Sequence, residues 1–198
     1  MSTRSNIAIR NADGSVTSVY CHWDGYPTNN GKILLRSYKT PTKVARLVKG
    51  GAISSLRDSL FTRKPHSFDK PAEGVTVSYS RDRNEDWDYC KPTNYANEEE
   101  WRTGDLEEWG YLFKDGSWFV VDCHCKTEDR KIVPLTKSYI EDYDKSEKAE
   151  YLRYICKGSK KPVTSADLRD KFCIRKKMKN ALVSDGVLVR TKGGYSVH

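Results

Sequence analysis

The residues best suited to chemistry lie together in the segment Tyr20–Pro27, which reads YCHWDGYP. Histidine is an effective general base near neutral pH, and a carboxylate two residues away can orient it or hold a metal ion. A metal-dependent nuclease, or another nucleic-acid-processing enzyme, would therefore use His22 and Asp24. However, Asp-Gly is a pair typical of turns. If a turn forms there, Asp24 caps it, His22 is a half-exposed strand residue and Trp23 belongs to the core.

The turn interpretation favours binding over catalysis, so we predict no catalytic residue and no enzyme. Binding sites are often built where several polar and aromatic side chains meet at one end of a strand. The candidate partner-binding residues are His22, Trp23, Asp24 and Tyr26. The whole chain supports this choice, since its sequence contains no P-loop, no nucleophile elbow and no His-Glu-x-x-His zinc motif.

A zinc site is the next possibility that the residue types raise. Cys123, His124 and Cys125 offer donors that Cys21 and His22 on another strand could complete. The spacing differs from that of structural zinc sites, where two to four residues separate paired cysteines. We therefore predict no metal and no cofactor, and we expect the six cysteines to be free thiols in a reducing cytosol.

The excess positive charge of the chain lies at its C-terminal end. The chain has 35 basic and 27 acidic residues, a net charge of +8. Residues 146–198 contain 13 basic and 5 acidic residues, so residues 1–145 are neutral, with 22 of each sign. A concentrated positive field attracts a polyanion better than the same charge spread evenly. This distribution predicts a basic module that binds nucleic acid, attached to a charge-balanced body.

Hydrophobic spacing divides the basic module into three helices and a hairpin. Apolar residues recur at helical intervals over residues 149–156, after Thr164 and over residues 174–182, and a glycine-turned hairpin follows at 187–197. This order resembles a winged helix-turn-helix domain over residues 146–198. The resemblance implies that the third helix enters a DNA major groove while the hairpin contacts the backbone.

The cations of this module are the candidate contacts to duplex DNA. Those on the third helix are suited to base edges or phosphates, and those on the flanking segments to phosphates. Winged helices also dock on proteins, so protein docking is the alternative. The candidate nucleic-acid-binding residues are Lys160, Lys161, Arg175, Lys176, Lys177, Lys179, Asn180, Arg190 and Lys192.

The body, residues 1–135, reads as an α+β domain. Alternating apolar residues around Asp-Gly turns predict hairpins over residues 7–23 and 109–123. Residues 40–50 begin with Thr-Pro and end with glycine, as a helix does. We expect an antiparallel sheet with one or two helices on a face. The mixed-sign run 81–86 is expected to be a solvated loop.

Residues 136–145 lie between the body and the small winged-helix domain of residues 146–198. They read as a linker or as a connecting helix. The chain has no apolar run near the roughly 20 residues of a membrane span, and its start lacks a signal region. We therefore expect a cytoplasmic protein with no membrane contact.

The N-terminal part of the body also resembles a known family. The pattern comprises TRSNI at Thr3–Ile7, Asp13-Gly14, YCHWDGY at Tyr20–Tyr26, Leu34-Leu35 and the spacing of Val44, Leu47 and Gly50. It is similar to a family of small proteins encoded by tailed bacteriophages, over residues 1–55. The resemblance implies phage origin and expression in the cytoplasm of a bacterial host, and it implies no activity.

The sequence as a whole favours a phage-encoded protein that binds nucleic acid or a partner. Its role would be host takeover, counter-defence or regulation of transcription, with duplex DNA and a host or defence protein as the expected partners. The first alternative is a pure protein inhibitor of a host or defence factor. The second is the metal-dependent nuclease that uses His22 and Asp24.

Overall fold

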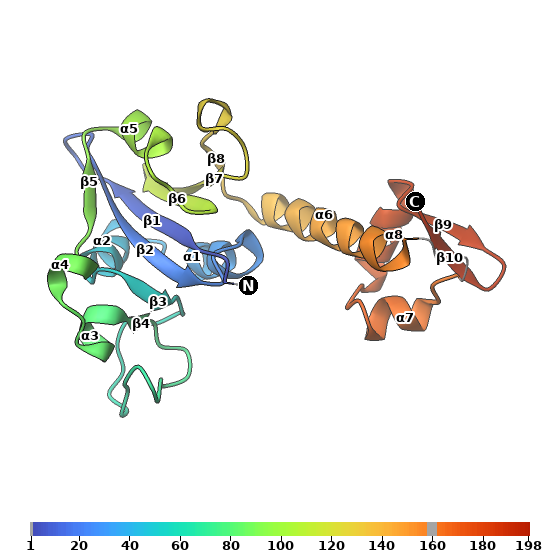
Figure 1. The fold of residues 1–198 in the computed structure, drawn as a ribbon, viewed down its shortest axis with the longest axis horizontal. Coiled ribbons are helices and arrows are strands. Elements are labelled where there is room, and N and C mark those ends of the chain that lie inside the picture. Colours follow the sequence, from blue (N-terminus) through green and yellow to red (C-terminus); the bar gives the residue numbers. More distant parts are fainter. Residues whose placement is uncertain (1, 158–161) are drawn as a thin grey trace. The chain divides into compact units, whose positions relative to one another are not determined.

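The computed structural model describes residues 2–157 and 162–198, and its contacts divide the chain into two units, Met1–Ile140 and Glu141–His198. The division falls within the segment 136–145 that the sequence marks as the junction. Helix α6 (Lys137–Cys156) runs through this point, so the junction is helical. The described residues of the chain form an α+β structure, as expected (Figure 1).

A mixed sheet forms the centre of the body. Its strands run in the order β4–β3–β2–β1–β6–β7–β8, and β5 also pairs with β2. The strands are β1 (Ser5–Arg10), β2 (Val16–Trp23), β3 (Ile53–Ser55), β4 (Val77–Ser78), β5 (Thr93–Tyr95), β6 (Trp109–Lys114), β7 (Ser117–Asp122) and β8 (Val133–Pro134).

The expectation of an antiparallel sheet is wrong at two pairings. Strand β1 runs parallel to β6, and β2 runs parallel to β3. Parallel neighbours need a long crossover connection, usually helical, and the β2–β3 connection contains helices α1 (Lys32–Ser37) and α2 (Pro41–Lys49). The crossover therefore carries the chain back to the same end of the sheet.

Both predicted hairpins are confirmed. Strands β1 and β2 pair antiparallel around a turn in which Gly14 has φ 87°. Strands β6 and β7 turn at Asp115 and Gly116, whose φ values are 51° and 76°. Positive φ at both central residues is what a type I′ turn requires, and its twist matches that of the two strands.

The body contains more helices than the one or two that we expected. In its described residues, α3 (Tyr79–Arg83), α4 (Trp87–Cys90) and α5 (Glu98–Thr103) join α1 and α2. Helix α2 begins and ends as predicted: the Thr40 side chain accepts a hydrogen bond from the Lys43 N–H, and Gly50 caps the other end. The additional helices are too short to give a periodic apolar stripe.

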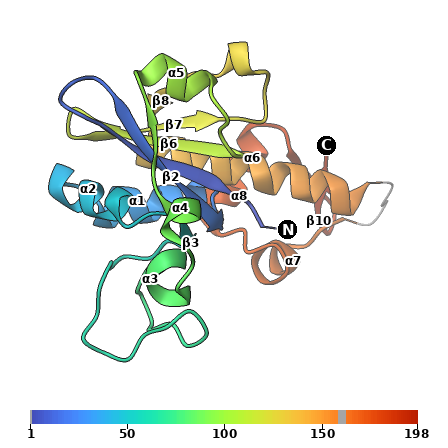
Figure 2. The same cartoon turned by 60° about the vertical axis from the view of Figure 1, so that its left-hand side comes forward.

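The sheet of the body is covered on both faces. On one face, Ala8, Leu112 and Val121 pack with Trp101 of α5. On the other face, the Trp118 indole N–H donates to the Tyr38 carbonyl, just after α1, at 2.7 Å. Figure 2 shows α5 on one side of the strands and α1 and α2 on the other. These two layers determine where the charged outer sides of the helices lie.

The mixed-sign run 81–86 is only in part the solvated loop that we expected: Arg81, Arg83, Asn84 and Asp86 are exposed, but residues 81–83 belong to α3. The side chain of Asp82, in α3, is only 4% exposed. It accepts hydrogen bonds from the Ser78 N–H at 2.8 Å and from Arg81 at 2.6 Å. His66 lies 3.2 Å away through Nε2, and its Nδ1 accepts from the Ala72 N–H, so Nε2 carries the hydrogen and donates. One buried carboxylate thus holds the preceding loop against α3.

We expect Asp82→Asn to lower the free energy of unfolding by about 1–3 kcal/mol at pH 7, because buried donors lose a charged acceptor. Burial acts to raise the pKa of Asp82, but hydrogen bonds from Arg81 and Ser78 outweigh it and lower the pKa. A carboxyl group whose pKa is lower in the folded state stabilises the fold at pH values above its ordinary pKa, which is about 4. This stabilisation is lost as the pH falls through the pKa of the folded state. Urea unfolding between pH 3 and pH 7, a range spanning about pH 4, should therefore show the difference from wild type shrinking in acid.

The matched control is Asp69→Asn, which removes the same charge from an exposed position. It should leave the free energy of unfolding within about 0.5 kcal/mol of wild type. Equal effects of the two substitutions at pH 7 would contradict a structural role for the buried carboxylate.

Candidate functional site

The C-terminal unit has the three helices and the hairpin that the sequence predicts. After α6 come α7 (Ser165–Asp170), α8 (Lys176–Ser184), β9 (Leu188–Thr191) and β10 (Gly194–Val197). Val163, between α6 and α7, forms an antiparallel bridge with Tyr195 of β10. The buried core of this unit consists of Ala149, Leu152, Leu168, Ile174, Leu182, Val187 and Leu188.

Local signals fix how α7 and α8 begin. Thr164 and Asp167 form a capping box at the start of α7. Hydrogen bonds from Lys171 and Thr164 lower the pKa of Asp167 to about 2, so this cap is ionised at neutral pH. Between the helices, the Ile174 N–H donates to the Leu168 carbonyl at 2.7 Å. Arg175 is the N-cap residue of α8, and its backbone there is extended.

A basic hollow lies between the start of α7, the start of α8 and the hairpin, with a volume of about 880 Å³. Five cations line it, and no carboxylate is among its described lining residues. We call this surface the basic hollow; it is lined by Ser165, Arg169, Cys173, Ile174, Arg175, Lys176, Lys179, Asn180, Arg190 and Tyr195.

Tyr195 is where the helices and the hairpin meet in the basic hollow. The Lys179 ammonium donates to the Ser165 hydroxyl at 3.3 Å and lies 5.5 Å from the centre of the Tyr195 ring. Arg190 is the cross-strand neighbour of Tyr195. Hydrogen bonds with Ser165 and Lys179 lower the pKa of Tyr195, and the bond with Ser165 has the larger effect. The hollow is thus electropositive, and its ammonium, guanidinium and amide groups can donate hydrogen bonds to anionic oxygens.

The structure brings five of the nine predicted nucleic-acid contacts together: Arg175, Lys176, Lys179, Asn180 and Arg190 line the basic hollow. Two others lie elsewhere, and two lie outside the described residues. Lys177 is on another side of α8, where its ammonium pairs with Glu141 at 2.7 Å, and Lys192 is exposed in the hairpin turn. The two outside are Lys160 and Lys161.

Arg169 and Ser165 also line the hollow, and neither is among the residues predicted from the sequence. They are four residues apart in α7 and therefore share one side of that helix. The helical spacing of its apolar residues identifies the buried side of α7. The residues on the opposite, polar side of that helix could therefore have been predicted as candidate contacts.

In the segment Tyr20–Pro27, the side chains of His22 and Asp24 interact with different neighbours. Nδ1 of His22 lies 2.6 Å from the Tyr20 hydroxyl, whereas the Asp24 side chain interacts with Tyr26. Burial raises the pKa of Tyr26, and the neighbouring Asp24 carboxylate raises it further. The expectation that Trp23 belongs to the core is wrong, because its side chain is at the last residue of β2 and is 46% exposed. His22 and Trp23 stack edge-on, with ring centroids 4.6 Å apart.

Gly25 and Asn30 attach this segment to the first strand. The Gly25 N–H donates to the Thr3 carbonyl and its own carbonyl accepts from the Tyr111 hydroxyl, both at 2.7 Å. The buried Asn30 amide donates to the Ser5 hydroxyl at 3.1 Å. These contacts give the segment a structural role and leave Trp23 as its exposed aromatic residue.

The cysteine and histidine residues considered for zinc lie in different surroundings. Cys21 is buried, and burial raises its pKa to about 11. Burial also raises the pKa of Cys123 to about 11. His124 pairs with Asp122 at 2.7 Å. Within the described residues, no three His, Cys, Asp or Glu side chains are placed to hold a metal ion.

Comparisons with known protein families, curated proteins and solved structures found no match. The resemblance to phage proteins therefore stays a prediction. Across the described residues, no helix is both long and apolar enough to cross a membrane.

We expect Gly25→Ala to lower the free energy of unfolding by about 1–3 kcal/mol, the usual cost of overpacking. A Cβ at this position would lie 2.5 Å from the Arg4 carbonyl oxygen. Gly31→Ala is the control, because Gly31 has φ −57° and a Cβ there would come no closer than 3.4 Å to a neighbouring atom, which is ordinary contact. Urea unfolding of both variants checks the prediction, and an unchanged midpoint for Gly25→Ala would contradict it.

Proposed function

We propose that the C-terminal unit binds duplex nucleic acid through the basic hollow. The observation that carries this proposal is the convergence of five cations on one concave surface that no carboxylate lines among its described residues. Such a surface suits a polyanion better than it suits a neutral ligand, because phosphate contacts supply most of the sequence-independent affinity for DNA.

The order of elements supports interpreting this unit as a winged helix. Helix, bridging strand, helix, helix and a two-stranded hairpin follow one another from α6 to β10. In that arrangement α8 lies in the major groove and the hairpin contacts the backbone. Arg175, Lys176 and Asn180 are then suited to base edges or nearby phosphates, and Arg190 to a phosphate. Lys192, Lys160 and Lys161 are proposed as flanking phosphate contacts.

The biological setting that we propose follows from the N-terminal resemblance. A phage protein made in the cytoplasm of a bacterial host would bind DNA to serve host takeover, counter-defence or regulation of transcription. The resemblance to phage proteins covers residues 1–55, which belong to the body, and the proposed DNA contacts belong to the other unit. The two proposals therefore rest on separate parts of the chain.

We expect the full-length chain to bind duplex DNA with an affinity that falls steeply with salt. Each neutralised phosphate contributes about −0.9 to the slope of log affinity against log salt. Lys176→Ala should lower the magnitude of this slope by about 1. Lys177→Ala removes the same charge from the neighbouring position, outside the hollow, and should keep the slope closer to wild type. Fluorescence anisotropy with a labelled duplex measures both.

Two results would contradict this proposal. One is the absence of binding by the wild-type chain at about 50 mM salt, where electrostatic binding is strong. The other is an equal effect of Lys176→Ala and Lys177→Ala, which would mean that the hollow has no special part in binding.

A second candidate function is docking on a host or defence protein, and the exposure of Trp23 favours it. Tryptophan is enriched where partner proteins contribute most binding energy. Capture of a host protein by the wild-type chain, resistant to nuclease treatment and lost in Trp23→Ala, would support this candidate. A nuclease that uses His22 and Asp24 has less support, because each of these side chains has a different neighbour.

A further inference from the structure

Residues 1–145, which comprise the body and the first part of α6, are neutral only in sum. Residues 25–68 contain nine basic residues and one acidic residue, whereas residues 69–145 contain 11 basic and 19 acidic residues. Residues 25–68 therefore have a net charge of +8, and residues 69–145 have a net charge of −8. A net charge taken over residues 1–145 conceals this separation.

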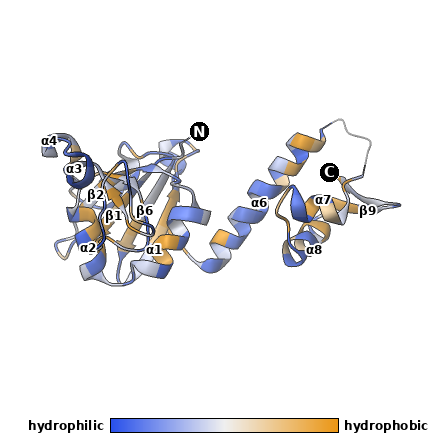
Figure 3. Cartoon of the chain, turned by 90° about the horizontal axis from the view of Figure 1, so that it is seen from below, coloured by the Kyte–Doolittle hydropathy of each residue, from blue (hydrophilic) through white to orange (hydrophobic). Residues whose placement is uncertain are grey.

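Six of the nine cations lie on or between α1 and α2. Val44, Leu47 and Val48 of α2 are buried. Three cations recur at three-residue intervals on the outer side of the same helix, and Figure 3 shows hydrophilic and hydrophobic residues alternating along α2. We call this surface the α1–α2 face; its cations are Lys32, Arg36, Lys39, Lys43, Arg46 and Lys49.

Little of this positive charge is neutralised within the body. Asp58 is the one carboxylate of the segment, and it forms an ion pair with Arg36 at 2.6 Å. The Lys43 ammonium donates to the backbone carbonyl of Asp58 at 3.1 Å and lies over the Tyr38 ring. Among the residues that the structure describes, no ion pair is found for the other four cations, Lys32, Lys39, Arg46 and Lys49.

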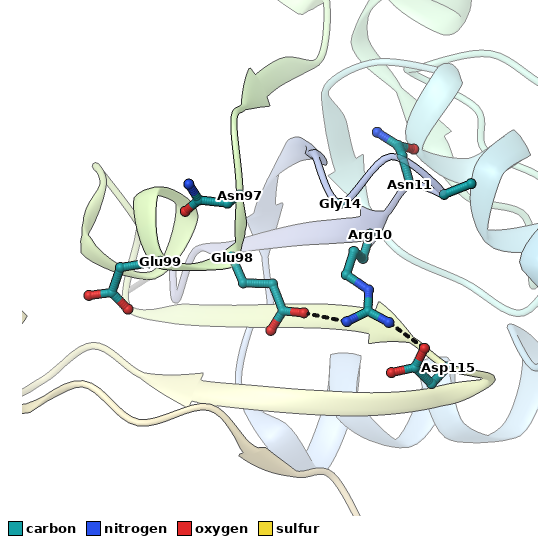
Figure 4. Close-up of a pocket in the computed structure, with 8 residues that line it drawn as sticks. Arg10, Asn11, Gly14, Asn97, Glu98, Glu99 and Asp115 are labelled. Atoms are coloured by element: carbon teal, nitrogen blue, oxygen red, sulfur yellow. Dashed lines mark hydrogen bonds and ion pairs between the residues drawn. The ribbon is translucent and has the colours of Figure 1, made fainter.

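Glu98 and Glu99 of α5 lie across the sheet and pair with other cations. Glu98 accepts from Arg10 at 2.8 Å and from Lys114 at 2.5 Å, and Arg10 also contacts Asp115 (Figure 4). Glu99 pairs with Arg102 within α5. These carboxylates are therefore not available to the α1–α2 face, which keeps its excess of positive charge.

We propose that the α1–α2 face is a second surface that binds the phosphate backbone of duplex nucleic acid. The proposal rests on the proposed function for the identity of the ligand, but it concerns a different unit of the chain. Helical rise places Lys43, Arg46 and Lys49 at steps of about 4.5 Å along the axis of α2. Flexible lysine and arginine side chains at such intervals suit phosphates, which carry no sequence information.

A duplex fits this surface better than a membrane does. Helices that lie in a bilayer surface insert an apolar side between the lipids. The apolar side chains Val44, Leu47 and Val48 of α2 are already buried in the body. The face is thus suited to contacts with charged groups alone.

The test uses the full-length chain and a labelled duplex over a range of salt concentrations. The variant Arg46→Gln with Lys49→Gln removes two charges from the α1–α2 face. Lys126→Gln with Lys131→Gln removes two exposed charges from outside it and gives the same net charge. We expect the first variant to lower the magnitude of the salt slope by about 2. The control should differ little from wild type, and circular dichroism of all three proteins checks their folding.

The outcomes separate this inference from the proposed function. An equal effect of the two double variants would overturn the inference, even if Lys176→Ala still weakens binding. A loss in the α2 variant with no effect of Lys176→Ala would support the inference and contradict the role of the basic hollow. No binding by the wild-type chain would overturn both. Binding to vesicles of phosphatidylcholine and phosphatidylserine that is lost in the α2 variant, with unchanged DNA binding, would instead identify a membrane surface.

Discussion

The architecture of the body depends on burying strand β1 on both of its faces. Ile7 and Ala8 are neighbours that point to opposite faces, and both are fully buried. Full burial of an aliphatic side chain stabilises a fold by about 1.5–3 kcal/mol, so neither face can be left uncovered without a large cost. Helices α1 and α2 cover one face, and α5 covers the other. Helices α1 and α2 contain cations and no carboxylate, whereas α5 contains three glutamates and one arginine, so the two layers differ in the sign of their formal charge.

The C-terminal unit uses the same kind of constraint on a smaller scale. Leu168, Ile174 and Leu182 are buried together, and they fix α7 and α8 against the hairpin. The cations of the basic hollow occupy positions of α7, α8 and the hairpin that do not take part in this packing. Their convergence therefore follows from a small apolar core, since no ion pair among the described residues draws them together.

Sequence reasoning predicted the elements whose signals are local. The Asp-Gly turns, the Thr40 cap of α2 and the apolar stripe of α8 act within a few residues, and each is confirmed. It did not predict that β1 pairs with β6, because no local pattern specifies a partner about a hundred residues away. The burial of Asp82 was missed for the same reason, since His66 comes from a separate loop. For the basic hollow, helical spacing placed the cations of α8 and could also have placed Arg169 on the polar side of α7, but Tyr195 required the tertiary structure.

The charge separation across the sheet also gives the body an electric dipole moment. In the field of an approaching polyanion, such a body experiences a torque that turns its positive side forward before any contact forms. The effect acts over roughly a Debye length, about 8 Å at physiological ionic strength, so it orders only the last stage of approach. The sheet that holds the core together thereby also selects which surface a polyanion encounters first.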